Sequence, residues 1–348
     1  MSLRTPTRPL YLSAADCQRV LLPEDVVRAI ENALGWEARG GVVWSEPRSL
    51  SMSDACGGRY HLKACVLELA GVAGVRLASH QADEAKGSTR WIILLDRATT
   101  LPIAIVDETW SYAQRTVAVM AVAARKLAAG SVEVPPPSGG RGAAERGGAS
   151  ILALVGAGRL AAAALTYYAH LFELAEVRIA SRREETRTAL AARARDRLGL
   201  KAVPAASIED AVRGADQILT CTSSGQGLLS ADWVSPGAVV SSLDTPEPGP
   251  EFYALADLLV VDSREQLAGE LVECYGPDAP ARVSATIGEV LAGRRPGRTS
   301  PKERVLIISQ GLASLDVALA ARAYELAQAQ GLGAELPMGP NPSLLESP

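Results

Sequence analysis

A short glycine turn between an apolar run and a helical segment constrains this chain most. Residues 151–155 are continuously apolar, as a parallel strand buried on both faces must be. Gly156 permits a tight turn directly after this run, and Gly158 lets a pyrophosphate approach the free N–H groups of the helix that follows. We therefore expect a dinucleotide to bind here rather than a glycine turn without a nucleotide. The expected contacts are Gly156, Ala157, Gly158, Arg159 and Leu160.

The end of the next predicted strand, residues 177–180, indicates which dinucleotide binds. Ser181, Arg182 and Arg183 follow the strand, and no acidic residue occurs before Glu184. NAD sites usually place Asp or Glu there to accept a bond from the ribose 2′-OH, whereas guanidinium groups bind a 2′-phosphate bidentately. We expect all three residues to contact the cofactor. The pattern favours NADP(H), with NAD(H) as the alternative and an exposed basic turn as the simplest explanation.

Strands and helices alternate through residues 151–311, which predicts a doubly wound parallel sheet, the Rossmann fold. Residues 1–133 instead mix helices and strands, and the final predicted helix is expected to return to them. Residues 1–133 and 312–348 are thus predicted to form a second, α+β domain, with a Pro/Gly-rich linker at 134–150. The other expected strands are 60–67, 74–78, 91–96, 102–107, 202–205, 217–220, 239–242, 258–262 and 305–308, and the expected helices are 23–39, 111–129, 159–172, 184–198 and 313–330.

Composition excludes several classes of protein. With 48% hydrophobic and 21% charged residues the chain is globular rather than disordered, and a net charge of −4 gives no basic footprint for nucleic acid. No apolar run approaches the ~18 residues of a membrane span, and residues 1–10 lack the apolar core of a signal peptide, so we expect a cytoplasmic protein. The five cysteines show no C-x-x-C spacing, which favours free thiols over a disulfide or a metal site.

Arg115 is the candidate for a second ligand that the residues themselves favour. It lies near the start of the predicted helix 111–129, with Val119 and Val122 on the same face. A cation in the first turn opposes the helix dipole, and a buried cation needs a partner. We therefore expect Arg115 to meet an anion, which would be a substrate carboxylate, a cofactor phosphate or an internal carboxylate.

Other polar residues are weaker candidates when each is taken alone. Arg48 and Lys63 are typical of solvated charges, although strand alternation places Lys63 on the same face as His61 and Cys65. Asp244 follows the predicted strand 239–242, at the sheet edge where ligands gather in α/β folds, but an Asp before Thr-Pro is also a common turn residue. Thr222 and Ser223 follow strand 217–220 and would either line the dinucleotide cleft or form a turn.

Taken in order, these residues resemble the ornithine cyclodeaminase/μ-crystallin family. The resemblance runs through nearly the whole chain with the family's spacing. The matching stretches are EPRS at 46–49, HLKA at 61–64, LDRATTLPIAIVD at 95–107, QRT at 114–116, VGAG at 155–158, LDTP at 243–246, VVDS at 260–263, GE at 269–270 and GLASLD at 311–316.

The resemblance implies a homodimer whose interface the first domain supplies. It implies that Arg48, Lys63 and Arg115 hold a substrate α-carboxylate, with Lys63 also part of the catalytic site. Asp244 would be the acid/base residue beside the substrate nitrogen, and Thr116 would touch the cofactor. The implied reaction is NAD(P)H-dependent reduction of an α-imino acid to an amino acid, or its reverse.

Three departures from the family pattern bear on the reaction. Ser181-Arg182 replaces the acidic residue that ornithine cyclodeaminases tend to carry, Gln114 is unusual, and Glu108 stands where glycine is frequent. They favour net reduction with an exchangeable NADPH. The alternatives are an ornithine cyclodeaminase, an opine-like or siderophore-precursor synthase, and a non-catalytic NADPH-binding protein similar to μ-crystallin.

Overall fold

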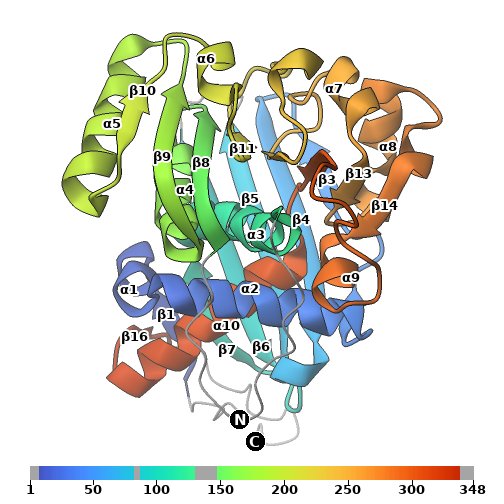
Figure 1. Ribbon diagram of the computed structural model, residues 1–348. Coiled ribbons are helices and arrows are strands. Elements are labelled where there is room, and N and C mark those ends of the chain that lie inside the picture. The colour runs from blue at the N-terminus through green and yellow to red at the C-terminus, as the bar shows by residue number, and fades with distance from the viewer. Residues whose placement is uncertain (1–7, 82–86, 130–146, 338–348) are drawn as a thin grey trace, which may run out of the picture. The chain divides into compact units, whose positions relative to one another are not determined.

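The computed structural model describes residues 8–81, 87–129 and 147–337 (Figure 1). The chain divides into two compact units, with residues 1–115 and 312–348 in unit 1 and residues 116–311 in unit 2. The first boundary falls inside helix α3 (Ser111–Leu127) rather than at the expected linker. Most of that linker, 134–146, lies outside the described residues, and its last four residues belong to a strand, β8 (Gly147–Val155).

Unit 2 contains one wholly parallel sheet. Its strands in sheet order are β10 (Ala202–Pro204), β9 (Phe172–Ala180), β8, β11 (Gln217–Thr220), β12 (Val239–Ser242), β15 (Val305–Ile308), β13 (Leu258–Val261) and β14 (Val283–Thr286). The chain order reverses between β8 and β11, which is the topological switch point of a doubly wound fold. The predicted Rossmann sheet is therefore confirmed.

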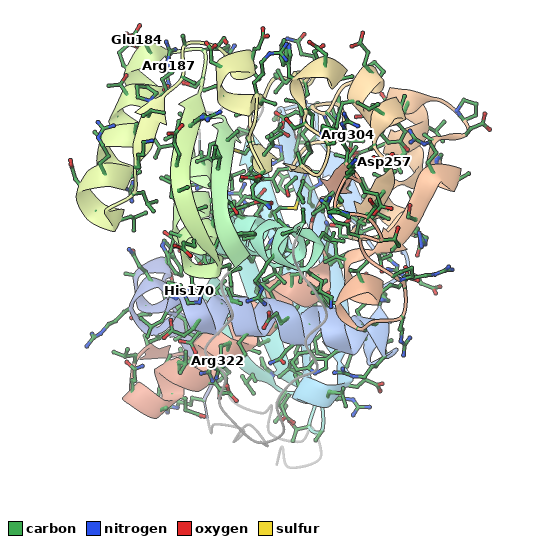
Figure 2. All side chains as sticks on the ribbon, viewed as in Figure 1. His170, Glu184, Arg187, Asp257, Arg304 and Arg322 are labelled. Carbon is green, nitrogen blue, oxygen red and sulfur yellow. The ribbon has the colours of Figure 1, made fainter. Side chains whose placement is uncertain are left out.

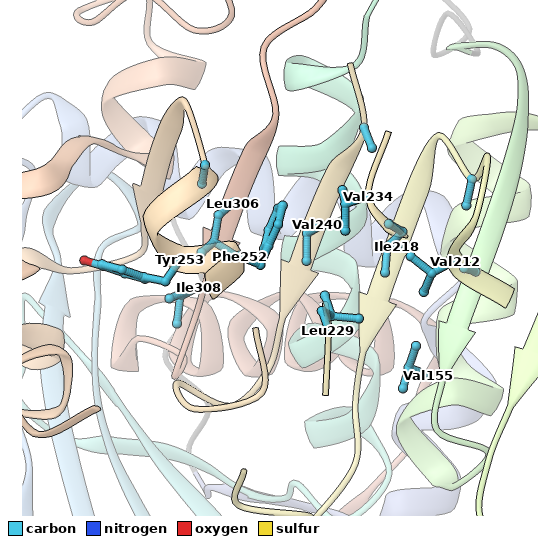
Figure 3. Packing of buried hydrophobic residues seen from close by; sticks show 14 of the residues in the cluster. Val155, Val212, Ile218, Leu229, Val234, Val240, Phe252, Tyr253, Leu306 and Ile308 are labelled. Carbon is cyan, nitrogen blue, oxygen red and sulfur yellow. The ribbon is translucent and has the colours of Figure 1, made fainter. Parts of the chain in front are cut away.

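The core of unit 2 explains why its strands were predictable. Val155, Ile218, Val240 and Ile308 come from four neighbouring strands and pack with Phe252 in one buried layer (Figure 3). The helices of this unit are α4 (Arg159–Leu171), α5 (Glu184–Leu198), α6 (Ile208–Val212), α7 (Pro250–Leu255), α8 (Arg264–Tyr275) and α9 (Ile287–Leu291). Ser207 caps α6 by accepting the N–H of Asp210.

Two strands of unit 2 begin earlier than their apolar runs. The expected starts at 151 and 177 are wrong, because β8 begins at Gly147 and β9 at Phe172. Backbone pairing continues through this extension, where Gly147 is in register with Phe172 and Ser150 with Leu174. Ladder hydrogen bonds do not need apolar side chains, so a hydrophobic run marks only the buried part of such a strand.

Unit 1 contains a second sheet, which is antiparallel except where β1 pairs with β7. Its strands in order are β16 (Ala334–Glu335), β1 (Leu10–Leu12), β7 (Pro102–Asp107), β6 (Ser88–Asp96), β5 (Val72–Gln81), β4 (Gly58–Leu67) and β2 (Val42–Trp44), with β3 (Leu50–Ser53) also paired with β4. Together with the parallel sheet of unit 2, this mixed unit confirms the predicted fold class.

Helix α10 (Ala313–Gln330) packs on this sheet and on helix α2 (Pro23–Ala38), and helix α1 (Ala14–Val20) completes the unit. The contact with β5 is close, because a Cβ added at Gly74 would lie 2.5 Å from Val317 Cγ2. Glycine at this point lets the helix backbone approach the strand. No helix in the described ranges is both long and apolar enough to cross a membrane.

Candidate functional site

The turn after β8 contains two glycines that the structure treats differently. Gly156 has a φ of +128° and its N–H donates to Ala180 O at 2.8 Å. A Cβ at Gly156 would lie 2.7 Å from Cys221 O, so the protein's own backbone requires glycine there. Gly158 has an ordinary φ of −88°, is exposed, and a Cβ added to it would meet no protein atom within 4 Å. The packing of the protein therefore does not require glycine at residue 158, and the space beside it is open to a ligand.

Helix α4 begins at this turn with features that suit a phosphate. Gly158 at its N-cap provides no side-chain cap, and the first turn contains no acidic residue. The first N–H groups of the helix therefore face outward with the positive end of the helix dipole, where an anion is stabilised. Arg159 is exposed beside them, while Ala157 and Leu160 are half-buried. The residues present fit a dinucleotide pyrophosphate.

The turn after β9 is basic. Ser181 Oγ donates to Arg183 O at 2.9 Å, while Arg182 and Arg183 are exposed. Arg187, which the sequence analysis did not select, donates from Nη1 to Ser181 O at 3.0 Å and lies at the start of α5 (Figure 2). The Glu184 side chain is 79% exposed and lies 3.8 Å from Arg187. Guanidinium groups thus dominate the point where a ribose 2′-substituent would be recognised.

The segment after β11 is held by a buried acid that the sequence analysis missed. Thr222 donates to Glu247 Oε1 from its backbone N–H at 2.9 Å and from its hydroxyl, and Ser223 is exposed. Glu247 is fully buried, and burial raises its pKa despite these hydrogen bonds. Nothing in the local sequence marks this role, because an acid between two prolines is typical of an exposed turn.

Asp244 lies just past β12, where it is both a turn residue and an acid whose pKa is raised. Ser242 Oγ donates to the main-chain oxygen of Asp244 at 2.7 Å. The side chain is half-buried, and burial together with the nearby Glu270 carboxylate raises the pKa of Asp244. Glu270 is itself fixed by Thr245, whose hydroxyl donates to it at 2.6 Å.

In unit 1, strand register places polar residues in rows on the face that α10 covers. Lys63 of β4 lies directly opposite Arg76 of β5. The next row along the strands contains His61, Ala78 and Arg90, with His61 stacked on His80 at a centroid distance of 5.4 Å. This face is therefore apolar at one end and cationic at the other.

Arg115 lies beside an internal carboxylate, which is one of the three kinds of anion that the sequence analysis considered for it. Arg115 Nε lies 2.5 Å from Asp316 Oδ1. Arg76 Nε lies 2.6 Å from Glu108 Oε2 and 3.4 Å from Asp316 Oδ2. These four side chains, which we call the Arg115 cluster, are each at most 6% exposed.

Tyr112 adds an aromatic surface to the Arg115 cluster. The guanidinium carbons of Arg90, Arg115 and Arg76 lie 4.4, 4.9 and 5.6 Å from the centre of its ring. Because a ring face is negative, it tolerates several cations side by side without cancelling their charge. The arrangement keeps positive charge available for an anion.

Arg48 is placed beside Lys63 by the strands on either side of it. Ser45 N–H donates to Ala64 O at 3.2 Å and Leu50 is in register with Leu62, so residues 46–49 flank the position of Lys63. The Arg48 guanidinium lies 4.6 Å from the centre of the Trp44 ring. Arg48 and Lys63 are both half-buried rather than fully solvated, and Thr116 is buried on α3.

Burial and charge give the two acids of the Arg115 cluster different proton affinities. Burial, followed by the charge of Asp316, raises the pKa of Glu108 to about 8. Burial acts in the same direction on Asp316, but Arg115 and Arg76 outweigh it and hold the pKa of Asp316 below its usual value. Of the two acids, Glu108 therefore holds a proton more readily than Asp316.

Sequence reasoning missed Arg76, and it assigned no role to Asp316 although the stretch 311–316 was matched. A signal for Arg76 was present, because it shares strand parity with Gly74 and Ala78, two small residues of an inward face. No local signal marked the pairing of α10 with α3. Among the described residues no group of three or more His, Cys, Asp or Glu is arranged to hold a metal ion, and the five cysteines are free.

Known proteins resemble the chain over both units. The model of the ornithine cyclodeaminase/mu-crystallin family matches residues 8–135 and 143–331, which include every candidate residue above. An alanine dehydrogenase of Archaeoglobus fulgidus is 28% identical over 340 residues, covering 94% of this chain and 98% of that protein. The ketimine reductase mu-crystallin of Mus musculus is 27% identical over 261 residues, covering 73% and 72%. A solved archaeal alanine dehydrogenase dimer with bound NAD has a TM-score of 0.82 at 25% identity, covering 94% of this chain and 99% of that one.

Proposed function

The chain belongs to the ornithine cyclodeaminase/mu-crystallin family, and on this premise we propose that it is an NAD(P)H-dependent oxidoreductase of α-imino acids. It would reduce a C=N bond to an amino acid or catalyse the reverse dehydrogenation. The similarity to an alanine dehydrogenase and to a ketimine reductase supports this class of reaction.

The dinucleotide is proposed to bind unit 2 at Gly156, Ala157 and Gly158, with its pyrophosphate at the N-terminus of α4. When bound, its nicotinamide would supply or accept the hydride. The basic turn formed by Ser181, Arg182 and Arg183 supports NADP(H) as the preferred form, because Glu184 is exposed and paired with a guanidinium. Thr116, Arg159, Leu160, Thr222 and Ser223 are the further proposed cofactor contacts.

The substrate α-carboxylate is proposed to bind unit 1 through Arg48, Lys63 and Arg115. Asp316 holds Arg115 in one orientation at 2.5 Å, so less side-chain freedom is lost when a carboxylate arrives. Several cations can converge on one ligand because the ligand neutralises them. In this arrangement Asp316 orients Arg115 and does not compete with the substrate carboxylate for it.

One observation carries the proposed chemistry, namely the half-buried position of the Asp244 carboxyl group at the carboxyl end of a parallel strand, where burial and the nearby Glu270 raise its pKa. An acid with a higher pKa retains its proton closer to neutral pH, which suits proton donation to an imine nitrogen. In the reverse direction the same carboxylate would take that proton. A protein that only binds a dinucleotide has no need of such an acid.

The experiment is a titration of the protein with NADPH and NADH, followed by tryptophan fluorescence, and then a panel of imino acids read by nicotinamide absorbance. Replacing Asp244 by Asn should leave cofactor affinity unchanged and lower turnover by about 10²–10⁴-fold, the usual contribution of a general acid. Asp278→Asn, an exposed aspartate of unit 2, is the matched control. Wild-type turnover by the Asp244→Asn variant would refute the mechanism, and cofactor binding without turnover on any imine would favour a cyclodeaminase, a synthase or a binding protein.

We also propose that the protein is a homodimer that uses the outer face of the unit 1 sheet. Leu77 and Ile93 have the opposite strand parity to the α10-covered Arg76 and Ile92, and they are 38% and 41% exposed. Adjacent exposed apolar side chains favour association. Light scattering measures the oligomeric state, and a monomer would contradict the proposal.

The cytoplasmic location stays a prediction.

A further inference from the structure

The Arg115 cluster contains two carboxyl groups that face each other inside the protein. Glu108 Oε1 and both carboxylate oxygens of Asp316 are buried, and none accepts a well-aligned N–H or hydroxyl hydrogen bond within the described residues. Glu108 Oε2 lies 2.6 Å and Asp316 Oδ2 lies 3.4 Å from the same atom, Arg76 Nε, so the two carboxyl groups meet at one guanidinium nitrogen. Two carboxyl groups can be hydrogen-bonded to each other only when one of them carries a proton.

We propose that Glu108 is a positioning residue that shares one proton with Asp316, and that this proton leaves one positive charge of the Arg76–Arg115 pair without an offsetting carboxylate, available to the substrate carboxylate. In this arrangement Glu108 donates to Asp316 and accepts from Arg76 at 2.6 Å. The inference rests on the proposed function, because it concerns the same carboxylate site.

The charge balance of the pair depends on that proton. With Glu108 protonated, Arg76 and Arg115 face only the charge of Asp316, so one positive charge remains. With Glu108 ionised, two carboxylates neutralise the two guanidinium groups, and an incoming carboxylate keeps the attraction of Arg48 and Lys63 but loses this positive charge. In a buried site this difference is large, because charges there are weakly screened.

The groups around Glu108 favour retention of the proton. Arg76 of β5 and Arg115 of α3 stabilise the ionised form, whereas burial and Asp316 of α10 oppose it, and the outcome is a pKa of about 8. Lys63 of β4 acts on Asp316, and Arg90 of β6 and Tyr112 of α3 complete the charged and titratable surroundings. Like charges at such close range do not both ionise readily.

Linkage then ties carboxylate binding to proton binding. A ligand that binds more tightly when Glu108 is protonated raises the proton affinity of Glu108 by the same factor. Carboxylate affinity should be constant below about pH 8 and should fall about tenfold for each pH unit above it. Above that pH, binding should be accompanied by uptake of about one proton.

The test is calorimetric titration with pyruvate and no amine, so that binding is measured without turnover. Between about pH 7 and about pH 9.5 the wild-type Kd should rise about 30-fold, and titration in two buffers of different ionisation enthalpy should report about one proton taken up at the higher pH. Glu108→Gln should bind at both pH values with nearly equal affinity and take up no proton. Its amide can donate to Asp316 and accept from Arg76, as the protonated acid does.

Glu68→Gln is the matched control, because it makes the same change in an exposed Arg–Glu pair of unit 1. It should keep the wild-type pH dependence. If Glu108→Gln does not fold, wild-type protein with ¹³C-labelled glutamate carboxyl groups should show a resonance that titrates near pH 8 and shifts when pyruvate binds.

Three outcomes would overturn the inference: a pyruvate affinity that does not change with pH, a Glu108→Gln variant that keeps the pH dependence, or no pyruvate binding at either pH. Failure of the proposed reaction is a separate result. If no imine is reduced while pyruvate binding still takes up a proton through Glu108, the inference stands and the proposed activity falls.

Discussion

The two glycines of the turn after β8 should respond oppositely to the same substitution. Gly158→Ala adds a Cβ that meets no protein atom within 4 Å, at a φ that any residue adopts. The folded protein should therefore tolerate it, and the unfolded chain should lose entropy, which stabilises by about 0.4–1 kcal/mol. Gly156→Ala places a Cβ 2.7 Å from Cys221 O at a φ of +128°, so it should destabilise by roughly 1–3 kcal/mol.

Cofactor affinity should separate the two variants in the other direction. The new methyl group at residue 158 would hold a pyrophosphate away from the N–H groups of α4. Loss of one hydrogen bond to a charged group costs about 1.5–3 kcal/mol, which corresponds to a rise of about ten- to hundred-fold in Kd. Gly158→Ala should thus bind NADPH at least about tenfold more weakly while remaining as stable as the wild type.

Thermal unfolding without cofactor and fluorescence titration with NADPH together measure both effects. The apo-protein midpoint should fall for Gly156→Ala and should hold or rise for Gly158→Ala. Wild-type NADPH affinity in Gly158→Ala would show that the pyrophosphate does not approach this residue. A lowered midpoint in that variant would show that the space beside Gly158 serves the fold.

Two further substitutions test the cofactor preference and the packing of unit 1. Replacing both Arg182 and Arg183 by Gln should weaken NADPH binding at least about tenfold and leave NADH binding within about twofold, because only NADPH carries the 2′-phosphate. Fluorescence titration measures both affinities, and the exposed Arg193→Gln is the control. Equal losses for both cofactors would refute the preference. Gly74→Ala should destabilise the folded protein by about 1–3 kcal/mol, because its Cβ would lie 2.5 Å from Val317 Cγ2. In urea unfolding, adding Val317→Ala should recover part of that loss. Strictly additive effects would show that the two residues do not meet.

Much of the fold was predictable because its signals are local. The strands that form the core of unit 2 are short apolar runs, and each is recognisable without reference to its partners. The strands that were missed, such as β1, β3 and β16, have two to four residues, which is too short for a hydrophobic pattern to identify a strand. They exist because a neighbouring strand offers backbone hydrogen bonds, and this information lies elsewhere in the chain.

The candidate site also contains features that are encoded locally and features that depend on distant parts of the chain. The dinucleotide turn is contained in a few consecutive residues, so its glycines could be interpreted from the sequence. The partner of Arg115 could not, because Asp316 comes from a helix that follows the whole of unit 2 in sequence. The need for an anion was predicted from burial and the helix dipole, but its source required the tertiary contact.

The pairing of β1 with β16 has a consequence for the order in which the protein matures on the ribosome. Leu10 and Tyr11 are in register with Glu335 and Ala334, so two neighbouring strands of this sheet, the first and last described strands in chain order, are translated more than three hundred residues apart. Unit 2 has all its strands before α10 and β16 are made. The nascent unit 1 sheet therefore lacks the helix that packs on one of its faces, and Arg115 lacks Asp316, until residues 313–330 have been translated.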